Sequence, residues 1–177
     1  ARLVRSGEPI TLSLPFPTEP AIDNPVPADH QMTMLTDEDV GSGTLRFAKD
    51  YVGADYHNPP HSHIDAFCHV SLDNALYNGK SSATVTSEGA EVDAIDVLKD
   101  GLVGRGVLLD VPRLRGVPWL VPGEHVFTED LEGAERNQGL AVREGDILLI
   151  RTGHAKRHLE LGPWDTDSAK AGLHPTV

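Results

Sequence analysis

The residues of this chain that could do chemistry gather in one short segment. Within 13 residues lie four of the nine histidines and one aspartate: His57, His61, His63, Asp65 and His69. Imidazole nitrogens together with a carboxylate form the usual ligand set for Zn²⁺ or Mn²⁺. The segment therefore predicts a site for a divalent metal ion, Zn or Mn.

The spacing within the segment favours a metal site over a solvated histidine loop. Side chains of an extended chain alternate, so that His61, His63 and Asp65 are expected to project from one face. Neighbouring members would lie about 6.6 Å apart at Cα, close enough for two side chains to bind one ion. The outer pair would lie about 13 Å apart and needs a bend, which the upstream Pro59-Pro60 pair could supply.

Cys68 and the histidines outside this segment are not expected to take part in the metal site. Cys68 shares a face with Ala66, opposite the candidate ligands, and is predicted to be a buried core residue rather than a nucleophile. A single cysteine excludes an internal disulfide and suits the reducing cytoplasm. Five histidines lack partners at metal spacing and are predicted to be surface or structural residues: His30, His125, His154, His158 and His174.

Two families of metal hydrolases with a related motif fit poorly. The metallo-β-lactamase-like hydrolases continue His-x-His-x-Asp with a histidine, whereas this chain has Ala66 there, and its preceding residues 51–60 are polar and broken by proline. Amidohydrolase barrels place His-x-His at the end of a strand, but they need about 250 residues of alternating strand and helix.

The block from His57 to His69, followed by Tyr77-Asn78-Gly79, resembles the cyclase family. That family is metal-dependent and includes the bacterial kynurenine formamidases and isatin hydrolases. Its longer members have His-Gly-x-x-His-Thr-His-x-Asp-Ala-x-x-His followed by Tyr-Asn-Gly. Four further segments resemble family landmarks, namely residues 1–10, 146–153, 161–164 and 171–175.

The resemblance implies a swivelling β/β/α fold in homodimers or homotetramers, and hydrolysis of an amide or lactam C–N bond. An arylformamidase of tryptophan catabolism, acting on a small-molecule substrate, is the expected type. The resemblance also implies that His63 and Asp65 are metal ligands and that His69 is the catalytic histidine. Shorter members place the first ligand where this chain has Pro59, so either His61 or His57 is the third ligand.

Two other functions remain open on the same scaffold. One is a metal-dependent cyclase or lyase that acts on a polyketide-like substrate, and the other is a degenerate, non-catalytic metal-binding member. For the hydrolase we expect a substrate pocket lined by Phe67, Trp119 or Trp164.

The hydrophobic pattern predicts an α/β fold with more strand than helix, which must position this block. Strands are expected at Pro9–Leu14, Gln31–Leu35, Thr44–Val52, Gly106–Val111 and Asp146–Arg151, with Gly41 and Gly43 in a turn. The last two strands are short apolar runs, typical of burial on both faces. Helices are expected at Val92–Lys99, at Thr128–Asn137 with Thr128 as its cap, and after Thr152-Gly153. The proline-rich residues 16–27 predict an irregular loop.

Length and charge limit the protein class. The 177 residues suit a single domain, residues 1–177. A net charge of -12 argues against nucleic acid or an anionic membrane as a partner, and no apolar run approaches the roughly 20 residues of a membrane span. A helix-like remnant at Ala1–Gly7 and the stop after Pro175 predict truncation at both ends. The resemblance implies that a further His and Glu of the family's site lie beyond Val177.

Overall fold

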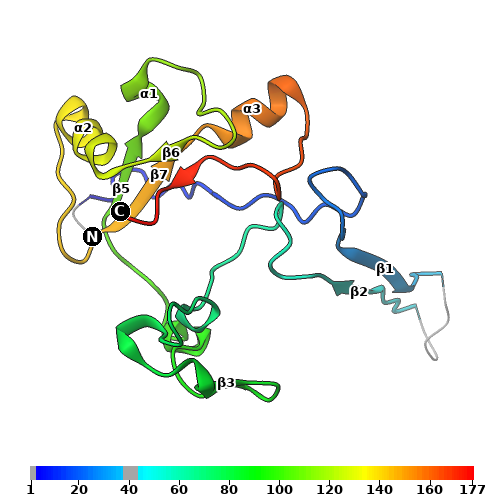
Figure 1. The fold of residues 1–177 in the computed structure, drawn as a ribbon. Helices are drawn as coiled ribbons and strands as arrows, with labels where there is room; N and C mark the ends of the chain where they lie inside the picture. Colours follow the sequence, from blue (N-terminus) through cyan, green and yellow to red (C-terminus); the bar gives the residue numbers. More distant parts are fainter. Residues whose placement is uncertain (1–2, 38–43) are drawn as a thin grey trace. The chain divides into compact units, whose positions relative to one another are not determined.

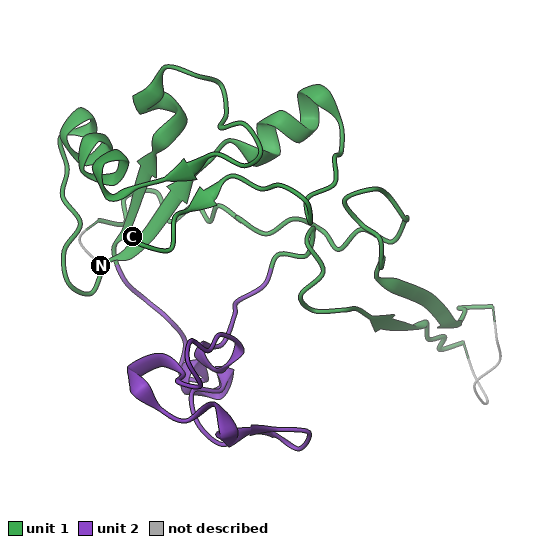
Figure 2. Cartoon of the chain, in the orientation of Figure 1, with its two compact units in different colours: residues 1–62, 105–177 green, residues 63–104 purple. Residues whose placement is uncertain are grey.

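A computed structural model describes residues 3–37 and 44–177 (Figure 1). The chain divides into two compact units, one formed by residues 1–62 and 105–177 and the other by residues 63–104 (Figure 2). The fold is mixed α/β, with short strands and few helices.

The first unit is built on two parallel strands, β5 (Gly106–Asp110) and β7 (Ile147–Arg151). Both strands were predicted from their apolar runs. Val107 and Leu109 are buried and pack with Ala134 of helix α2 (Thr128–Gln138). Leu108, between them, is 48% exposed. The strand is therefore buried on one face only, and the expectation of burial on both faces is wrong, because α2 packs against the face of Val107 and Leu109.

Helix α2 has nearly the predicted bounds, but it is capped differently. Its first residue is Thr128, which was expected to be the cap. The carboxylate of Asp130 instead accepts a hydrogen bond from the backbone N–H of Phe127 at 2.9 Å. Gly139 ends the helix with φ +65°, as predicted from the preference of glycine for this left-handed conformation.

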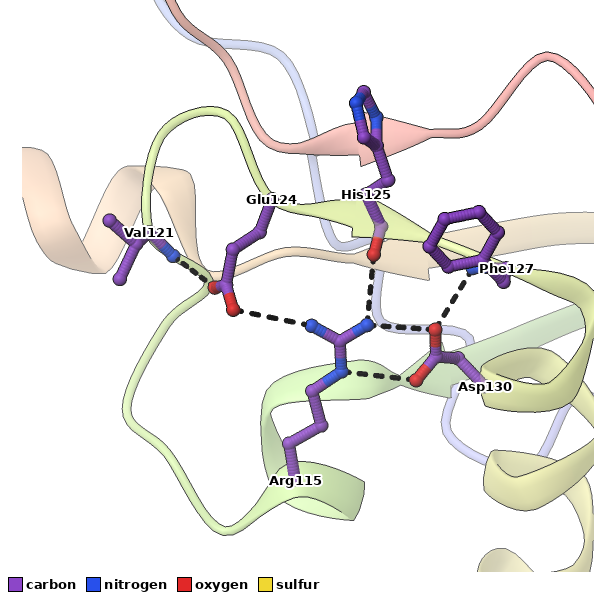
Figure 3. Close-up of polar contacts among 6 residues, drawn as sticks. All are labelled: Arg115, Val121, Glu124, His125, Phe127 and Asp130. Atoms are coloured by element: carbon purple, nitrogen blue, oxygen red, sulfur yellow. Dashed lines mark hydrogen bonds and ion pairs between the residues drawn. The ribbon is translucent and has the colours of Figure 1, made fainter.

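Arg115 joins three elements of this unit (Figure 3). It lies at the end of α1 (Val111–Arg115) and donates two hydrogen bonds to Asp130, at 3.0 and 2.8 Å. A third goes to the carbonyl of His125, at 2.8 Å, at the start of β6 (His125–Val126). The guanidinium holds the pKa of the Asp130 carboxyl below its usual range. The network fixes the start of α2 against α1 and β6.

Two further elements complete this part of the unit. Strand β8 (Gly172–Leu173) pairs with β6 in parallel. Helix α3 (His154–Leu161) follows β7 after Thr152-Gly153, as predicted. Gly153 has φ +83°, and a Cβ there would lie 2.7 Å from the backbone Cα of Trp119. Only glycine fits this turn.

The N-terminal predictions had mixed outcomes. Residues 16–27 form the predicted irregular loop, but Pro9–Leu14 is not a strand. Ile10 and Leu12 are 83% and 73% exposed, because no strand among the described residues pairs with this segment. The described part of the expected helix remnant, Leu3–Gly7, forms turns and bends, and Ala1 and Arg2 lie outside the described residues.

An antiparallel pair follows this loop. It consists of β1 (Asp29–Met34) and β2 (Lys49–Gly53), close to the strands expected at Gln31–Leu35 and Thr44–Val52. The predicted turn at Gly41 and Gly43 lies outside the described residues.

The second unit consists mainly of short turns. Its regular elements are the antiparallel strands β3 (Val85–Thr86) and β4 (Gly89–Ala90) and the 3₁₀ turns Phe67–His69, Tyr77–Gly79, Ser82–Thr84 and Ile95–Leu98. The last of these replaces the helix expected at Val92–Lys99. Cys68 packs with Ala66 and Leu76 in the core of this unit, which confirms its predicted burial.

Among residues 3–37 and 44–177, no helix is both long and apolar enough to cross a bilayer.

Candidate metal centre

Two successive turns shape the loop that begins the histidine block. The carbonyl oxygen of Asp55 accepts the backbone N–H of Asn58 at 3.1 Å, and the carbonyl of Asn58 accepts that of His61 at 2.9 Å. The Asp55 carboxylate accepts the N–H of His57 at 3.2 Å. The Pro59-Pro60 pair lies within the second turn, where its fixed φ angles suit a bend.

Asn58 anchors this loop in the first unit. Asn58 is 4% exposed, and its side-chain Nδ2 donates to Asn24 Oδ1 at 2.6 Å and to the Val26 carbonyl at 2.8 Å. Asn24 in turn donates to the carbonyls of Pro17 and Glu19. Sequence reasoning missed Asn58 as a positioning residue. The one sequence signal for Asn58 was that the family block has glycine at this position.

His61 is buried within this loop. The residue is 3% exposed, its ring lies 4.5 Å from that of Phe16, and its Nδ1 donates to the Asp55 carbonyl at 2.6 Å. His63 and Asp65 are exposed. The arrangement of His61, His63 and Asp65 on one face of an extended chain is therefore not seen, because the turns bury His61.

The structure instead brings His57 together with His63 and Asp65. Each offers one ligand atom, and these three atoms lie within 4.8 Å of one another. Two imidazoles and one carboxylate are a donor set that fits Zn²⁺ or Mn²⁺. Three protein ligands also leave a coordination position for water or substrate, as in catalytic metal sites. The group thus fits a divalent ion, while the assignment of the individual ligands stays a prediction.

His69 contacts this group through Asp65. Its Nδ1 is hydrogen-bonded to Asp65 Oδ1. An ionised carboxylate can only accept, so Nδ1 carries the proton and the lone pair of the neutral ring lies on Nε2. His69 ends the 3₁₀ turn Phe67–His69, in which Phe67 stacks on Tyr77 with ring centres 4.5 Å apart. The Tyr-Asn-Gly landmark therefore packs against the histidine block.

The histidines outside the block have other contacts. His30 lies 3.1 Å from Asp50, and His158 lies 2.9 Å from Asp23. His125 and His174 contact each other with ring centres 5.2 Å apart, and His154 lies 4.5 Å from the ring of Trp164. None of the five belongs to a group of potential metal ligands among the described residues.

Comparison with known proteins identifies the family. The family profile described as "Putative cyclase" matches residues 10–177. A crystal structure described as that of a novel cyclase is similar at a TM-score of 0.80 and 29% sequence identity, and the match covers 98% of this chain. The chain spans 60% of the length of that protein. A comparison with curated proteins found no significant match. The profile covers nearly the whole sequence, including the histidine block, and the chain therefore belongs to the cyclase family.

Proposed function

We propose that the protein is a metal-dependent hydrolase of an amide or lactam C–N bond, with an aryl formamide as its substrate. The observation that supports this proposal best is the group formed by His57, His63 and Asp65, with His69 hydrogen-bonded to Asp65. A metal-ligand group with an adjacent histidine supplies the two functions that amide hydrolysis needs, which are carbonyl activation and proton transfer.

The roles of the residues follow from their chemistry. His57, His63 and Asp65 would hold the ion, which when bound supplies Lewis acidity toward a carbonyl and toward water. His69 would take a proton from water at Nε2 as the oxygen bonds to the carbonyl carbon. It would then return that proton to the nitrogen as the C–N bond breaks, giving a carboxylic acid and an amine. Proton transfer of this kind contributes about 10²–10⁴-fold to a rate.

Asp65 has a second role in this proposal. By accepting from Nδ1 of His69 it fixes the tautomer that leaves the lone pair on Nε2. The finer features that the resemblance implies belong to the same proposal: a swivelling β/β/α fold, Zn or Mn as the ion, assembly into homodimers or homotetramers, and a cytoplasmic location.

The test is turnover of two amides by protein supplied with Zn²⁺ or Mn²⁺. N-Formylkynurenine and isatin should be hydrolysed, with release of the aryl amine and of the ring-opened acid. His69→Ala should remove this activity, whereas His174→Ala, outside the block, should keep it. Metal-loaded protein that hydrolyses neither amide would contradict the proposal. Conversion of a polyketide-like substrate instead would assign the protein to the cyclase or lyase alternative.

A further inference from the structure

Asp93, in the second unit, combines three features that cost folding free energy. Its backbone has φ +58°, a left-handed conformation that strains residues other than glycine, although aspartate tolerates it better than most. Its side chain is only 8% exposed. Its Oδ2 atom is buried without a hydrogen-bond partner among the described residues. An outlier of this kind indicates a functional constraint.

Asp93 links the turn Phe67–His69 to the turn Tyr77–Gly79. Its backbone carbonyl accepts the N–H of Cys68, the middle residue of the first turn, at 3.1 Å. Its Oδ1 accepts a charge-assisted hydrogen bond from Nζ of Lys80, directly after the second turn, at 2.5 Å. One residue therefore holds both turns.

The segment around Asp93 is also held by packing. Cys68 and Leu76 are buried in the core of this unit, and Val92, next to Asp93 in the chain, packs against that core. The carbonyl of Lys80 accepts the N–H of Leu76 at 2.7 Å. The backbone carbonyl that Cys68 bonds to therefore has a defined position.

The turn that Asp93 holds sets the contact between His69 and Asp65. The N–H of His69 donates to the carbonyl of Ala66 at 3.1 Å, and Asp65 Oδ1 accepts the N–H of Ala66 at 3.1 Å. Nδ1 of His69 bonds to that same Oδ1 across the turn. Because Cys68 lies within this turn and donates to Asp93, a shift of its backbone would move the His69 ring relative to the carboxylate.

We propose that Asp93 is a positioning residue for His69, because it holds the turn in which Nδ1 of His69 donates to Asp65. The bond from Lys80 to the Asp93 carboxylate keeps the Asp93 carbonyl aimed at the N–H of Cys68. The effect of Asp93 on turnover rests on the proposed function, whereas its effect on the ring of His69 does not.

The test compares two aspartate-to-glycine variants within the second unit. Asp93→Gly removes the carboxylate but suits φ +58°, so this variant is expected to fold. Asp73→Gly is the matched control, because Asp73 is exposed and has φ +49° in the same unit. Urea unfolding of each variant first establishes that the protein is folded under the conditions of the assay.

The first readout is the tautomer of the His69 ring in metal-free protein at about pH 8, where an unperturbed imidazole is neutral. Two-bond proton–nitrogen correlation spectra distinguish the two tautomers. Wild type and Asp73→Gly should carry the proton on Nδ1, whereas Asp93→Gly should show a mixture, because the bond to Asp65 that selects one tautomer is loosened. Lys80→Met, which removes the cation from the half-exposed side of the pair, should act in the same direction and decides the question if Asp93→Gly is unfolded.

The second readout is turnover of N-formylkynurenine by metal-loaded protein. Asp93→Gly should lower kcat about 10–100-fold and change KM less than about threefold, because misplacement of a catalytic group by about 1 Å costs rate on that order. Asp93→Asn, which keeps an acceptor for Lys80, should restore most of kcat and the Nδ1 tautomer. A purely structural role would lower the free energy of unfolding of Asp93→Gly and leave the tautomer and kcat of the folded protein unchanged, and that result would overturn the proposal.

The two readouts separate this inference from the proposed function. A mixed tautomer in Asp93→Gly, without amide hydrolysis by metal-loaded wild type, would support the positioning role and contradict the hydrolase. Hydrolysis that Asp93→Gly and Lys80→Met leave unchanged, with the proton still on Nδ1 of His69, would support the hydrolase and overturn the positioning role.

Discussion

Replacement of Asn58 by alanine should loosen the loop that carries His57. The change deletes Nδ2, which donates to the Oδ1 of Asn24 and to the carbonyl of Val26. Both acceptors then lose their donor in a region from which water is largely excluded, since Asn24 is 2% exposed. The loop would keep its backbone turns but lose its attachment to residues 24–26.

The magnitude follows from those two acceptors. Leaving a buried acceptor without a partner costs about 1–3 kcal/mol, and the Val26 carbonyl is only partly buried, so the total should be about 2–4 kcal/mol. For a chain of this length that lowers Tm by about 5–15 °C. Because the loop positions His57, affinity for Zn²⁺ should also fall, by about 10–100-fold, as it does when residues that support metal ligands are removed.

Urea unfolding and zinc titration measure the two effects. Asn137→Ala, at an exposed position of α2, is the matched control, and its free energy of unfolding should stay within about 0.5 kcal/mol of the wild type. Asn58→Asp should be at least as harmful as Asn58→Ala, because it sets a carboxylate against two acceptors. An Asn58→Ala protein with unchanged stability and zinc affinity would refute the anchoring role.

Three other perturbations have equally specific outcomes. Gly153→Ala should cost more than about 2 kcal/mol in urea unfolding, because it strains a positive φ and places Cβ 2.7 Å from Cα of Trp119; a neutral change would contradict this packing. Arg115→Met should cost about 1–3 kcal/mol at pH 7. Arg115 lowers the folded-state pKa of Asp130, so the difference in unfolding free energy between the wild type and Arg115→Met should be complete at pH values above the ordinary carboxyl pKa. It should shrink as the pH falls through the lowered pKa of Asp130. A difference in unfolding free energy that stays constant down to pH 2 would exclude the pairing. His69→Ala should retain metal, measured by elemental analysis, while it loses turnover, and loss of metal would make His69 a ligand.

Local signals predicted the elements that lie nearest the core of the first unit. These signals are the apolar runs of β5 and β7 and the glycine after α2, and each involves only residues adjacent in the sequence. The structure has the three elements within a residue or two of the predicted bounds. Alternation alone failed at Pro9–Leu14, because a strand also needs a partner, and among the described residues none pairs with it.

The candidate site was predictable as a block but not in its arrangement. Residue types and spacing located a metal-ligand segment and placed His61, His63 and Asp65 on one face, while the family resemblance left His57 and His61 as alternatives for the third ligand. In the structure His57 offers a ligand atom within 4.8 Å of those of His63 and Asp65, whereas His61 is buried against Phe16 and donates from Nδ1 to the Asp55 carbonyl. Those contacts depend on the turns of the loop and on a residue 45 positions away, neither of which follows from histidine spacing.

A divalent ion should bind at His57, His63 and Asp65. An anomalous difference map from crystals of the protein grown with Zn²⁺, recorded on both sides of the zinc absorption edge, tests it most directly. We predict one strong peak within bonding distance, about 2.0–2.2 Å, of one atom of each of these residues. A peak on His61 instead of His57, or no peak at the block in protein that binds zinc elsewhere, would contradict this assignment.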